Sequence, residues 1–423
     1  MAGLGGNIYK TLRPLAMKVG SNRALRTISA AYEMVMPMIF LGGIFALLDN
    51  LDIEAYQIFI AATGIKPFLS LPSKFTVDLL SLYLAFTAGY SYINAEGNGA
   101  DGITSGLISL LCFFIVIPIN GPAVHGDMTA GIQTDYFGSK GLLTALAAGI
   151  LAGMCYESGK KILAVKVPDG FPASIENAVN TLIPGAVAIG LFLAVCGLTQ
   201  AYSTGVIAQR IYDTIIRLLQ AMGSSLAVYC FLIFVSDVLW FFGIHGAQVT
   251  MPVFLLLFMA AGADNQSALS AGQSPQNIIT MGLVAYLTLG GAGGTIGLAM
   301  LMRFFSKSER YRTLGKMAVL PSLCNVNEPI LFGIPIISNP LMAVPFFVLP
   351  QAAILLTYGV MRLGLVAPPR LAAGVPGMPF LLDGFLMCGI PGAAWQAVLT
   401  AITFVGYYPF FRIQDEAAYR EEQ

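Results

Sequence analysis

The chain has 423 residues, of which 57% are hydrophobic and only 10% are charged. A soluble protein carries roughly 25% charged residues because its surface must be solvated, so this composition excludes an ordinary soluble domain and indicates a protein embedded in lipid. The formal net charge is zero, which gives no electrostatic support for binding nucleic acid or another polyanion.

Apolar runs of about 20 residues predict an all-α integral membrane protein with about ten transmembrane helices. The expected spans are 27–48, 75–92, 102–119, 139–156, 178–200, 225–242, 248–263, 278–302, 340–361 and 393–411. Residues 49–74 and 120–138 are expected to be short loops on the outside. The N-terminus lacks the apolar segment and cleavage site of a signal peptide, so the first span is expected to be a true transmembrane helix.

The segment 204–222 differs from the spans because its apolar and charged residues fall on different faces of a helix. Ile207, Ile211 and Ile215 share one face, whereas Arg210 and Asp213 lie elsewhere. This pattern predicts an amphipathic helix along the membrane interface. We therefore expect an N-terminal half at 1–203, a connecting helix at 204–222 and a C-terminal half at 223–423.

Basic residues predict the orientation of the chain, because Lys and Arg are enriched in cytoplasmic loops. One cluster precedes the first span, a second follows the fourth span and a third follows the eighth span. Because an even number of spans separates them, all three are expected on the same side of the membrane. They are Lys10, Arg13, Lys18, Arg23 and Arg26; Lys160, Lys161 and Lys166; and Arg303, Lys307, Arg310, Arg312 and Lys316. The N- and C-termini are therefore predicted to be cytoplasmic.

Two regions do not fit plain spanning helices. Residues 237–252 contain Gly243, His245 and Gly246, and residues 320–340 contain several prolines and polar residues. Non-helical backbone is tolerated at membrane depth only where protein buries it or where it lines a cavity. We therefore predict two re-entrant hairpins that build a substrate site. The glycine-rich run 290–297 is instead expected to allow close helix packing inside the span 278–302.

Glu328 and His245 are the strongest candidate catalytic residues. A carboxylate inside the bilayer is costly, and it commonly marks a functional site. Desolvation beside Asn325, Asn327 and Pro329 would suit Glu328 to abstract a proton. The alternative is that Glu328 anchors a hairpin by hydrogen bonds and that His245 is structural.

Further candidates are identified by their place next to these two residues. Three asparagines could bind hydroxyl groups of the substrate: Asn325, Asn327 and Asn339. Alternatively, they form hydrogen bonds with the backbone N–H and C=O groups of the hairpin. Trp240 is a candidate for stacking on a sugar ring, or an interfacial anchor. Asp237 and Glu33 are weaker candidates that could equally anchor neighbouring helices.

The sequence gives no indication of a metal or a cofactor. The six cysteines are scattered singly and form no CxxC or Cys/His cluster, so inert thiols are expected. A Walker A motif is absent, which excludes ATP hydrolysis by this chain.

Four motifs resemble a known family. The segments FFGIHGAQV and NVNEPILFGIPIISNP, together with KVPDGFPASIENAVNTLIPG and YYPFFRIQD, are similar to the lactose/cellobiose (chitobiose)-type enzyme IIC permeases. These belong to the bacterial phosphoenolpyruvate-dependent sugar phosphotransferase system. The resemblance covers nearly the whole chain. One departure is Val375-Pro376-Gly377-Met378, where the family commonly has Val-Pro-Trp-Thr.

The resemblance implies group translocation across the bacterial inner membrane. A sugar, expected to be a disaccharide such as cellobiose, lactose or diacetylchitobiose, is carried inward and phosphorylated on its 6-hydroxyl. Glu328 would act as base with His245 beside it. The phosphoryl group would come from a separate IIB protein, with a separate IIA protein upstream. The family also implies a homodimer formed by the first half and sugar binding by the second half.

Two other classes of function remain open from the residues. In an ion-coupled secondary sugar symporter, Glu328 would carry a proton or bind sodium, and the sugar would arrive unmodified. A sugar sensor is the least favoured class, because no signalling domain is recognisable.

Overall fold

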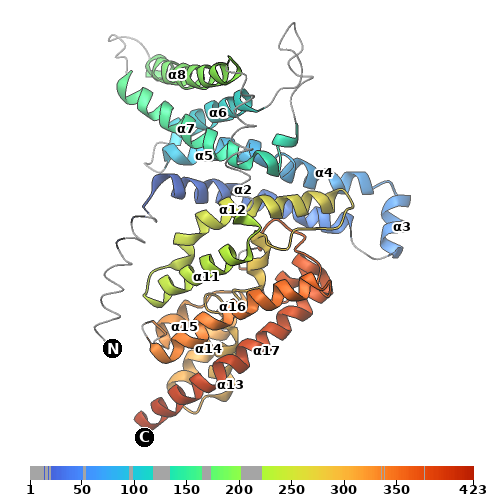
Figure 1. Cartoon of the computed structure of the whole chain (residues 1–423), viewed down its shortest axis with the longest axis vertical. Helices are drawn as coiled ribbons and strands as arrows, with labels where there is room; N and C mark the ends of the chain where they lie inside the picture. Colours follow the sequence, from blue (N-terminus) through green and yellow to red (C-terminus); the bar gives the residue numbers. More distant parts are fainter. Residues whose placement is uncertain are drawn as a thin grey trace. The chain divides into compact units, whose positions relative to one another are not determined.

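A computed structural model describes residues 21–50, 54–94, 99–117, 134–163, 173–201, 222–334, 336–337, 339–375 and 377–423, with Pro14 and Lys18. Every regular element in these ranges is a helix (Figure 1). Six helices in the described ranges are long and apolar enough to cross a membrane: Arg23–Asp49, Ser139–Ile162, Val179–Gly197, Gly246–Ser270, Pro340–Arg362 and Leu382–Glu421. The prediction of an all-α membrane protein is confirmed at this level.

The chain divides into two compact units. One, the C-terminal unit, contains Gly223–Phe254 and Asp264–Gln423, and the other, the N-terminal unit, contains Ser21–Met222 and Leu255–Ala263. The amphipathic helix predicted at 204–222 lies almost wholly outside the described residues.

In its described residues, the N-terminal unit is built from seven α-helices together with the middle of α12. They are α2 (Arg23–Asp49), α3 (Glu54–Ala62), α4 (Lys66–Val77), α5 (Leu80–Asn94), α6 (Gly99–Val116), α7 (Leu142–Ile162) and α8 (Ala173–Ala201). Small residues let α5, α6 and α7 approach closely: a Cβ at Gly149 would lie 2.5 Å from Cβ of Ala88. The hydroxyl of Ser105 on α6 also donates to the carbonyl of Gly89 on α5, at 2.9 Å. Such packing is typical of helices in membranes.

The prediction of a plain loop at 49–74 is wrong, because α3 and the first part of α4 occupy most of it. Two short 3-10 helices, Thr134–Tyr136 and Ser139–Gly141, precede α7. Most of the second predicted loop, 120–138, falls outside the described residues.

The C-terminal unit contains shorter helices joined by non-helical segments. Its helices are α11 (Leu226–Phe241), α12 (Gly246–Ser270, whose middle belongs to the N-terminal unit), η5 (Met281–Tyr286), α13 (Ile296–Phe305), α14 (Glu309–Leu323), α15 (Glu328–Gly333), α16 (Pro340–Arg362) and α17 (Leu382–Glu421). Side-chain caps start several of them. Ser225 accepts from the N–H of Val228 at α11, and Ser308 accepts from that of Tyr311 at α14.

The predicted span 278–302 is not a continuous helix. Residues Met281–Tyr286 form a 3-10 helix, a glycine-rich loop follows, and α13 begins only at Ile296. Glycines 290, 291, 293 and 294 all have positive φ angles, between +63° and +96°. An α-helix requires negative φ, so the prediction that these glycines serve helix packing is wrong.

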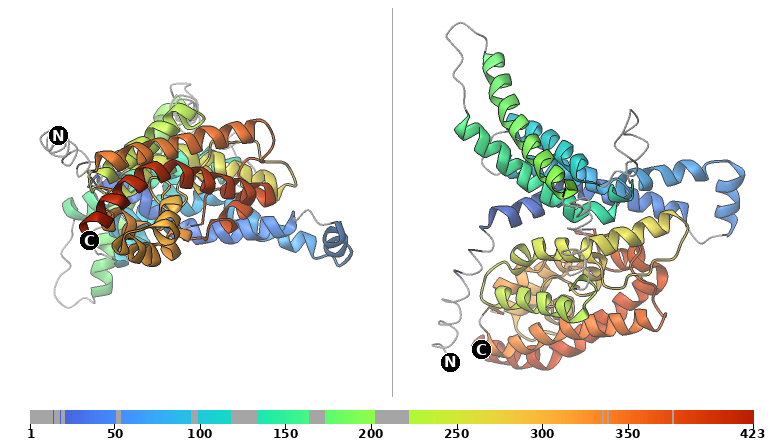
Figure 2. Two further views of the ribbon diagram at one scale, coloured as in Figure 1. Left: turned by 90° about the horizontal axis from the view of Figure 1, so that it is seen from below. Right: turned by 45° about the horizontal axis from the view of Figure 1, so that its top comes forward.

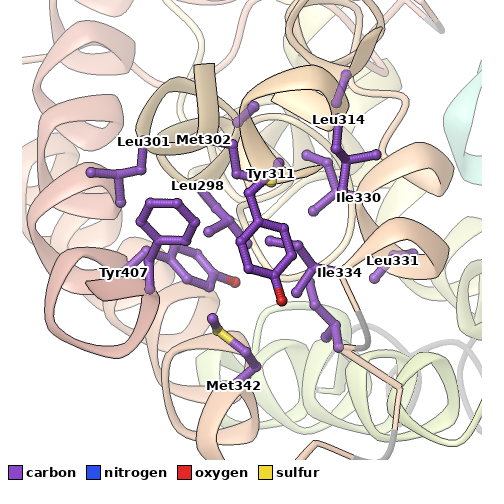
Figure 3. Packing of buried hydrophobic residues seen from close by; sticks show 14 of the residues in the cluster. Leu298, Leu301, Met302, Tyr311, Leu314, Ile330, Leu331, Ile334, Met342 and Tyr407 are labelled. Carbon is purple, nitrogen blue, oxygen red and sulfur yellow. The ribbon is translucent and has the colours of Figure 1, made fainter. Parts of the chain in front are cut away.

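A hydrophobic core holds α13, α14, α15 and α17 together. Figure 3 shows Leu298 and Met302 of α13 packed near Tyr311 of α14 and Tyr407 of α17, with Ile330 of α15 on the same cluster. All five side chains are buried, and α16 contributes Met342 and Phe346. Helices α16 and α17 run side by side in both views of Figure 2. The core therefore fixes α15, which carries Glu328, against its neighbours.

Two further irregularities lie beyond the predicted hairpins. Helix α17 starts at Leu382, well before the predicted 393–411 span, and Cys388 and Gly389 interrupt it with non-helical angles. Residues 363–381 are non-helical where they are described, yet Val366, Leu371 and Ala372 are buried. Side chains of α12 satisfy this backbone: Asn265 donates to the carbonyl of Pro369 at 2.8 Å, and Gln266 accepts from Ala372 at 2.9 Å.

Candidate functional site

A cavity of about 250 Å³ lies in the C-terminal unit, where α11, the start of α12, the glycine-rich loop and the residues before α15 meet. Five of the six predicted site residues line it: Trp240, His245, Asn325, Asn327 and Glu328. Two breaks that are about 80 residues apart in the sequence therefore contribute to one site. The volume is near the lower end of the roughly 300–1,000 Å³ of ligand pockets.

His245 lies in the sharp turn between α11 and α12. Gly243, with φ of +79°, reverses the chain after α11, and His245 then forms the N-cap of α12. Its Nδ1 accepts a hydrogen bond from the backbone N–H of Gln248 at 3.2 Å. A neutral imidazole that accepts at Nδ1 carries its proton on Nε2. His245 is therefore arranged as a hydrogen-bond donor through Nε2.

Trp240 packs directly against this histidine. The two ring centroids are 4.2 Å apart with an interplanar angle of 46°. Only 6% of Trp240 is exposed, and the residue also belongs to the hydrophobic core of the unit. Its contact supports the orientation of the imidazole.

Glu328 is the first residue of α15, which has Asn327 as its N-cap and Pro329 in its first turn. The residue is exposed, in contrast to the desolvation expected for it, whereas Asn327 before it and Ile330 two positions after it are buried. Glu328 and His245 both line the cavity. A carboxylate and a ring N–H donor therefore face the same cavity.

Asn325 and Asn327 hydrogen-bond the glycine-rich loop. Oδ1 of Asn325 accepts from the N–H of Gly290 at 3.0 Å. Nδ2 of Asn327 donates to the carbonyl of Ala292 at 2.7 Å and to Oγ1 of Thr295 at 2.9 Å. In the structure, the two asparagines therefore form hydrogen bonds with backbone groups, which is one of the two roles that the sequence left open for them.

Asn339 is not among the residues that line this cavity. It is the N-cap of α16, where Oδ1 accepts from the N–H of Leu341 at 3.0 Å. Its Nδ2 donates to Oε1 of Gln414 on α17 at 3.2 Å. The structure thus gives Asn339 a capping and interhelical role.

The cavity also contains one of the weaker candidates, Asp237, and residues that the sequence did not single out as ligands. Asp237 of α11 and Thr288, Gly291 and Gly293 of the glycine-rich segment line its wall. Asp237 is only 3% exposed, and its Oδ2 is buried without a hydrogen-bond partner. The glycine run in the sequence could have indicated a loop at the site, but its apolar neighbours made it resemble a spanning helix.

Within the described ranges, no three His, Cys, Asp or Glu side chains gather as a metal site.

The sequence matches a known family over most of its length. The family "Phosphotransferase system, EIIC" matches residues 31–350. The chain is 32% identical to the lichenan permease IIC component of Bacillus subtilis (strain 168), over 98% of this chain and 94% of that protein. It is 30% identical to the cellobiose-specific EIIC component of Geobacillus stearothermophilus, over 97% and 94%.

A solved structure is similar over almost the full length. The transporter ChbC, the IIC component of an N,N'-diacetylchitobiose-specific phosphotransferase system, superposes with a TM-score of 0.89 at 29% identity. The match covers 98% of each chain. The chain therefore belongs to the EIIC family, the membrane-embedded sugar permeases of the phosphotransferase system.

Proposed function

We propose that the cavity of the C-terminal unit binds the transported sugar and presents one of its hydroxyl groups for phosphorylation. The observation that carries this proposal is the meeting of Glu328 and His245 at one cavity, from two separate breaks in the helices. A carboxylate at membrane depth is costly and commonly marks a functional site. The family assignment favours this reading over an ion-coupled symporter, which has no support from the comparisons.

The two side chains have different roles in the proposed reaction. The carboxylate of Glu328 removes the proton from the sugar hydroxyl as its oxygen attacks the phosphorus carried by phospho-IIB. A P–O bond to the sugar forms, and the bond between phosphorus and the IIB side chain breaks. His245 donates from Nε2 to a sugar oxygen and does not act as the base, because its Nδ1 is already an acceptor at the N-cap.

The substrate proposed here is a disaccharide whose 6-hydroxyl lies near Glu328. The relatives named for lichenan, cellobiose and diacetylchitobiose support this class. Trp240 lines the cavity and offers the apolar face of an indole to a sugar ring. Asn325 and Asn327 act on the substrate indirectly, through the loop that they hold.

EIIC permeases work with IIA and IIB proteins, and here these are proposed to be separate chains. A homodimer formed by the N-terminal half is proposed from the family resemblance. The membrane arrangement proposed is about ten transmembrane helices, with re-entrant segments around 237–252 and 320–340. Shorter apolar helices such as Leu226–Phe241 and Ile296–Phe305 support a count above six.

The test is uptake of labelled cellobiose, lactose and diacetylchitobiose into vesicles that contain phosphoenolpyruvate and the soluble phosphotransfer proteins. The native chain should accumulate sugar phosphate. Glu328→Gln should lower the rate of sugar phosphate formation about 10²- to 10⁴-fold, the usual contribution of a general base, while sugar binding stays within a few-fold.

Glu309→Gln is the matched control, because it makes the same chemical change at an acid in the first turn of α14, outside the cavity. It should leave phosphorylation unchanged. Native rates in Glu328→Gln would contradict the proposed role of Glu328. Free sugar driven by an ion gradient would contradict group translocation.

A further inference from the structure

The glycine-rich loop that follows η5 is packed closely against its neighbours. A Cβ at Gly291 would overlap the side chain of Asn327, and one at Gly293 would overlap the ring of Phe346. Both glycines also have positive φ, +96° and +74°. The loop therefore lies tightly between the segment that precedes Glu328 and helix α16, and its buried carbonyl groups need partners from the protein.

The hydroxyl of Thr295 joins the two ends of this loop to each other and to Asn327. Its Oγ1 donates to the carbonyl of Gly290 at 2.7 Å and accepts from Nδ2 of Asn327 at 2.9 Å. A hydroxyl has one hydrogen to donate and lone pairs to accept, so both bonds form together. Thr295 is fully buried, so a side chain of the same shape without the hydroxyl would leave both partners without this bond.

Asn327 connects the loop to Glu328. Its Nδ2 also donates to the carbonyl of Ala292 at 2.7 Å. Its backbone carbonyl accepts from the N–H groups of Ile330 and Leu331 in α15, each at 2.9 Å. The side chain is thus bonded to the loop while the backbone starts α15. Because Asn327 directly precedes Glu328, a shift of the loop displaces the backbone from which Glu328 projects.

A second buried hydroxyl bonds the same loop from α17. Tyr407, labelled in Figure 3, donates from its hydroxyl to the carbonyl of Gly293 at 2.8 Å. This residue is also fully buried. The carbonyl of the preceding residue, Ala292, is the one that accepts from Asn327. Two consecutive carbonyl groups of the loop are therefore held, one from α17 and one from the segment before Glu328.

We propose that Thr295 and Tyr407 are positioning residues for Glu328 and act through the glycine-rich loop and Asn327. Neither residue lines the cavity, and neither is assigned a contact with the reacting atoms. This role rests on the proposed function of Glu328 as base. Displacement of a reacting group by about 1 Å can cost on the order of 10²-fold in rate. The loop residues that line the cavity are glycine and alanine, without polar side chains for the sugar, so rate should fall more than affinity.

The test compares Thr295→Val with Thr295→Ser in the purified full-length permease, with phospho-IIB as donor. The labelled sugar is the one among cellobiose, lactose and diacetylchitobiose that the native chain phosphorylates. Val keeps the branching and loses the hydroxyl, whereas Ser keeps the hydroxyl. Thr295→Val should lower turnover per bound sugar about 10²-fold while the Kd for the sugar changes less than about threefold. Thr295→Ser should recover most of the turnover.

Tyr407→Phe provides an independent variant, because it removes only the hydroxyl that holds the carbonyl of Gly293. It should also lower turnover with little change in Kd. The matched control is Thr357→Val, the same change at another fully buried threonine of the unit. Thr357 accepts a hydrogen bond from Trp395 and makes none with the loop, so turnover should be native.

A double variant tests whether Thr295 acts through the base. If it does, Thr295→Val should lower the residual turnover of Glu328→Gln less than about threefold, because residues that act as a unit are not additive. A loss of about 10²-fold in both backgrounds would show that Thr295 acts by another route and would overturn the positioning role.

The remaining outcomes separate this role from the proposed function. If Glu328→Gln is impaired and Thr295→Val turns over normally, the positioning role is wrong and the base remains. Native turnover in Glu328→Gln removes the base and the positioning role together. Equal losses in Thr295→Val and Thr295→Ser, or a loss of affinity that matches the loss of turnover, would also overturn the positioning role. If Thr295→Val does not fold, native turnover in Tyr407→Phe overturns it.

Discussion

At the scale of single residues, His245 combines two tasks that are separable by mutation. Its Nδ1 caps α12, and this bond leaves the ring proton on Nε2 for the cavity. Trp240 packs on the ring and limits its motion. One side chain therefore starts a helix and provides a donor at the site.

Substitution by alanine and by asparagine should separate the two tasks. His245→Ala removes the cap, which should lower the free energy of unfolding by about 1 kcal/mol, whereas asparagine is itself a preferred N-cap and should retain most of it. Both variants lose the Nε2 donor, so phosphorylation should fall roughly 10-fold or more in each. Thermal unfolding in detergent and rates of sugar phosphate formation measure the two effects. Native activity in His245→Asn would refute the donor role.

At the scale of elements, the glycine-rich loop is the segment on which the site depends. Positive φ at Gly293 and contact with Phe346 together require glycine there. Gly377 offers a matched comparison in the same unit, because its φ is +72° but a Cβ there would meet nothing within 4 Å.

Alanine at the two positions should therefore differ in cost. Gly377→Ala should lose about 1–2 kcal/mol of stability from left-handed backbone alone. Gly293→Ala should lose about 1–3 kcal/mol more from overpacking against Phe346. Only Gly293→Ala should also impair phosphorylation. Unfolding temperatures of the purified variants provide the comparison, and equal destabilisation would show that the contact with Phe346 is unimportant.

At the scale of the whole molecule, the predicted orientation rests on basic residues at three points along the chain. The turn between α13 and α14 illustrates this, with Arg303, Lys307 and Arg310 close together in sequence. Such residues favour the cytoplasmic side of a bacterial membrane. Helix α17 begins well after this turn and carries the C-terminus at its far end.

Reporter fusions at Gln423 should test the predicted cytoplasmic C-terminus. A green fluorescent protein joined there should fluoresce, since it folds in the cytoplasm. Alkaline phosphatase joined at the same residue should be inactive, since it requires the periplasm. The opposite pair of results would place the C-terminus outside, which requires either a reversed orientation or an odd number of spans.

The sequence identified residues that line one cavity, but it did not predict all of the helices around them. Glu328 and His245 stood out because polar groups at membrane depth are costly, and that cost is visible residue by residue. The prediction of a helix at 278–302 was wrong because hydropathy reports the environment of a segment and not its φ angles. A buried loop and a spanning helix have similar compositions when the loop backbone is satisfied by neighbouring side chains.

By itself, the sequence determined the class of the protein, its all-helical architecture and the two breaks that hold Glu328 and His245. These properties follow from composition and local chain chemistry. The tertiary structure decided that the two breaks share one cavity, that Asn339 lies elsewhere as the cap of α16, and that Asn325 and Asn327 hydrogen-bond the glycine-rich loop. The reason is physical: those relations depend on hydrogen bonds between residues dozens of positions apart, and no local pattern encodes which distant partner a buried polar group finds.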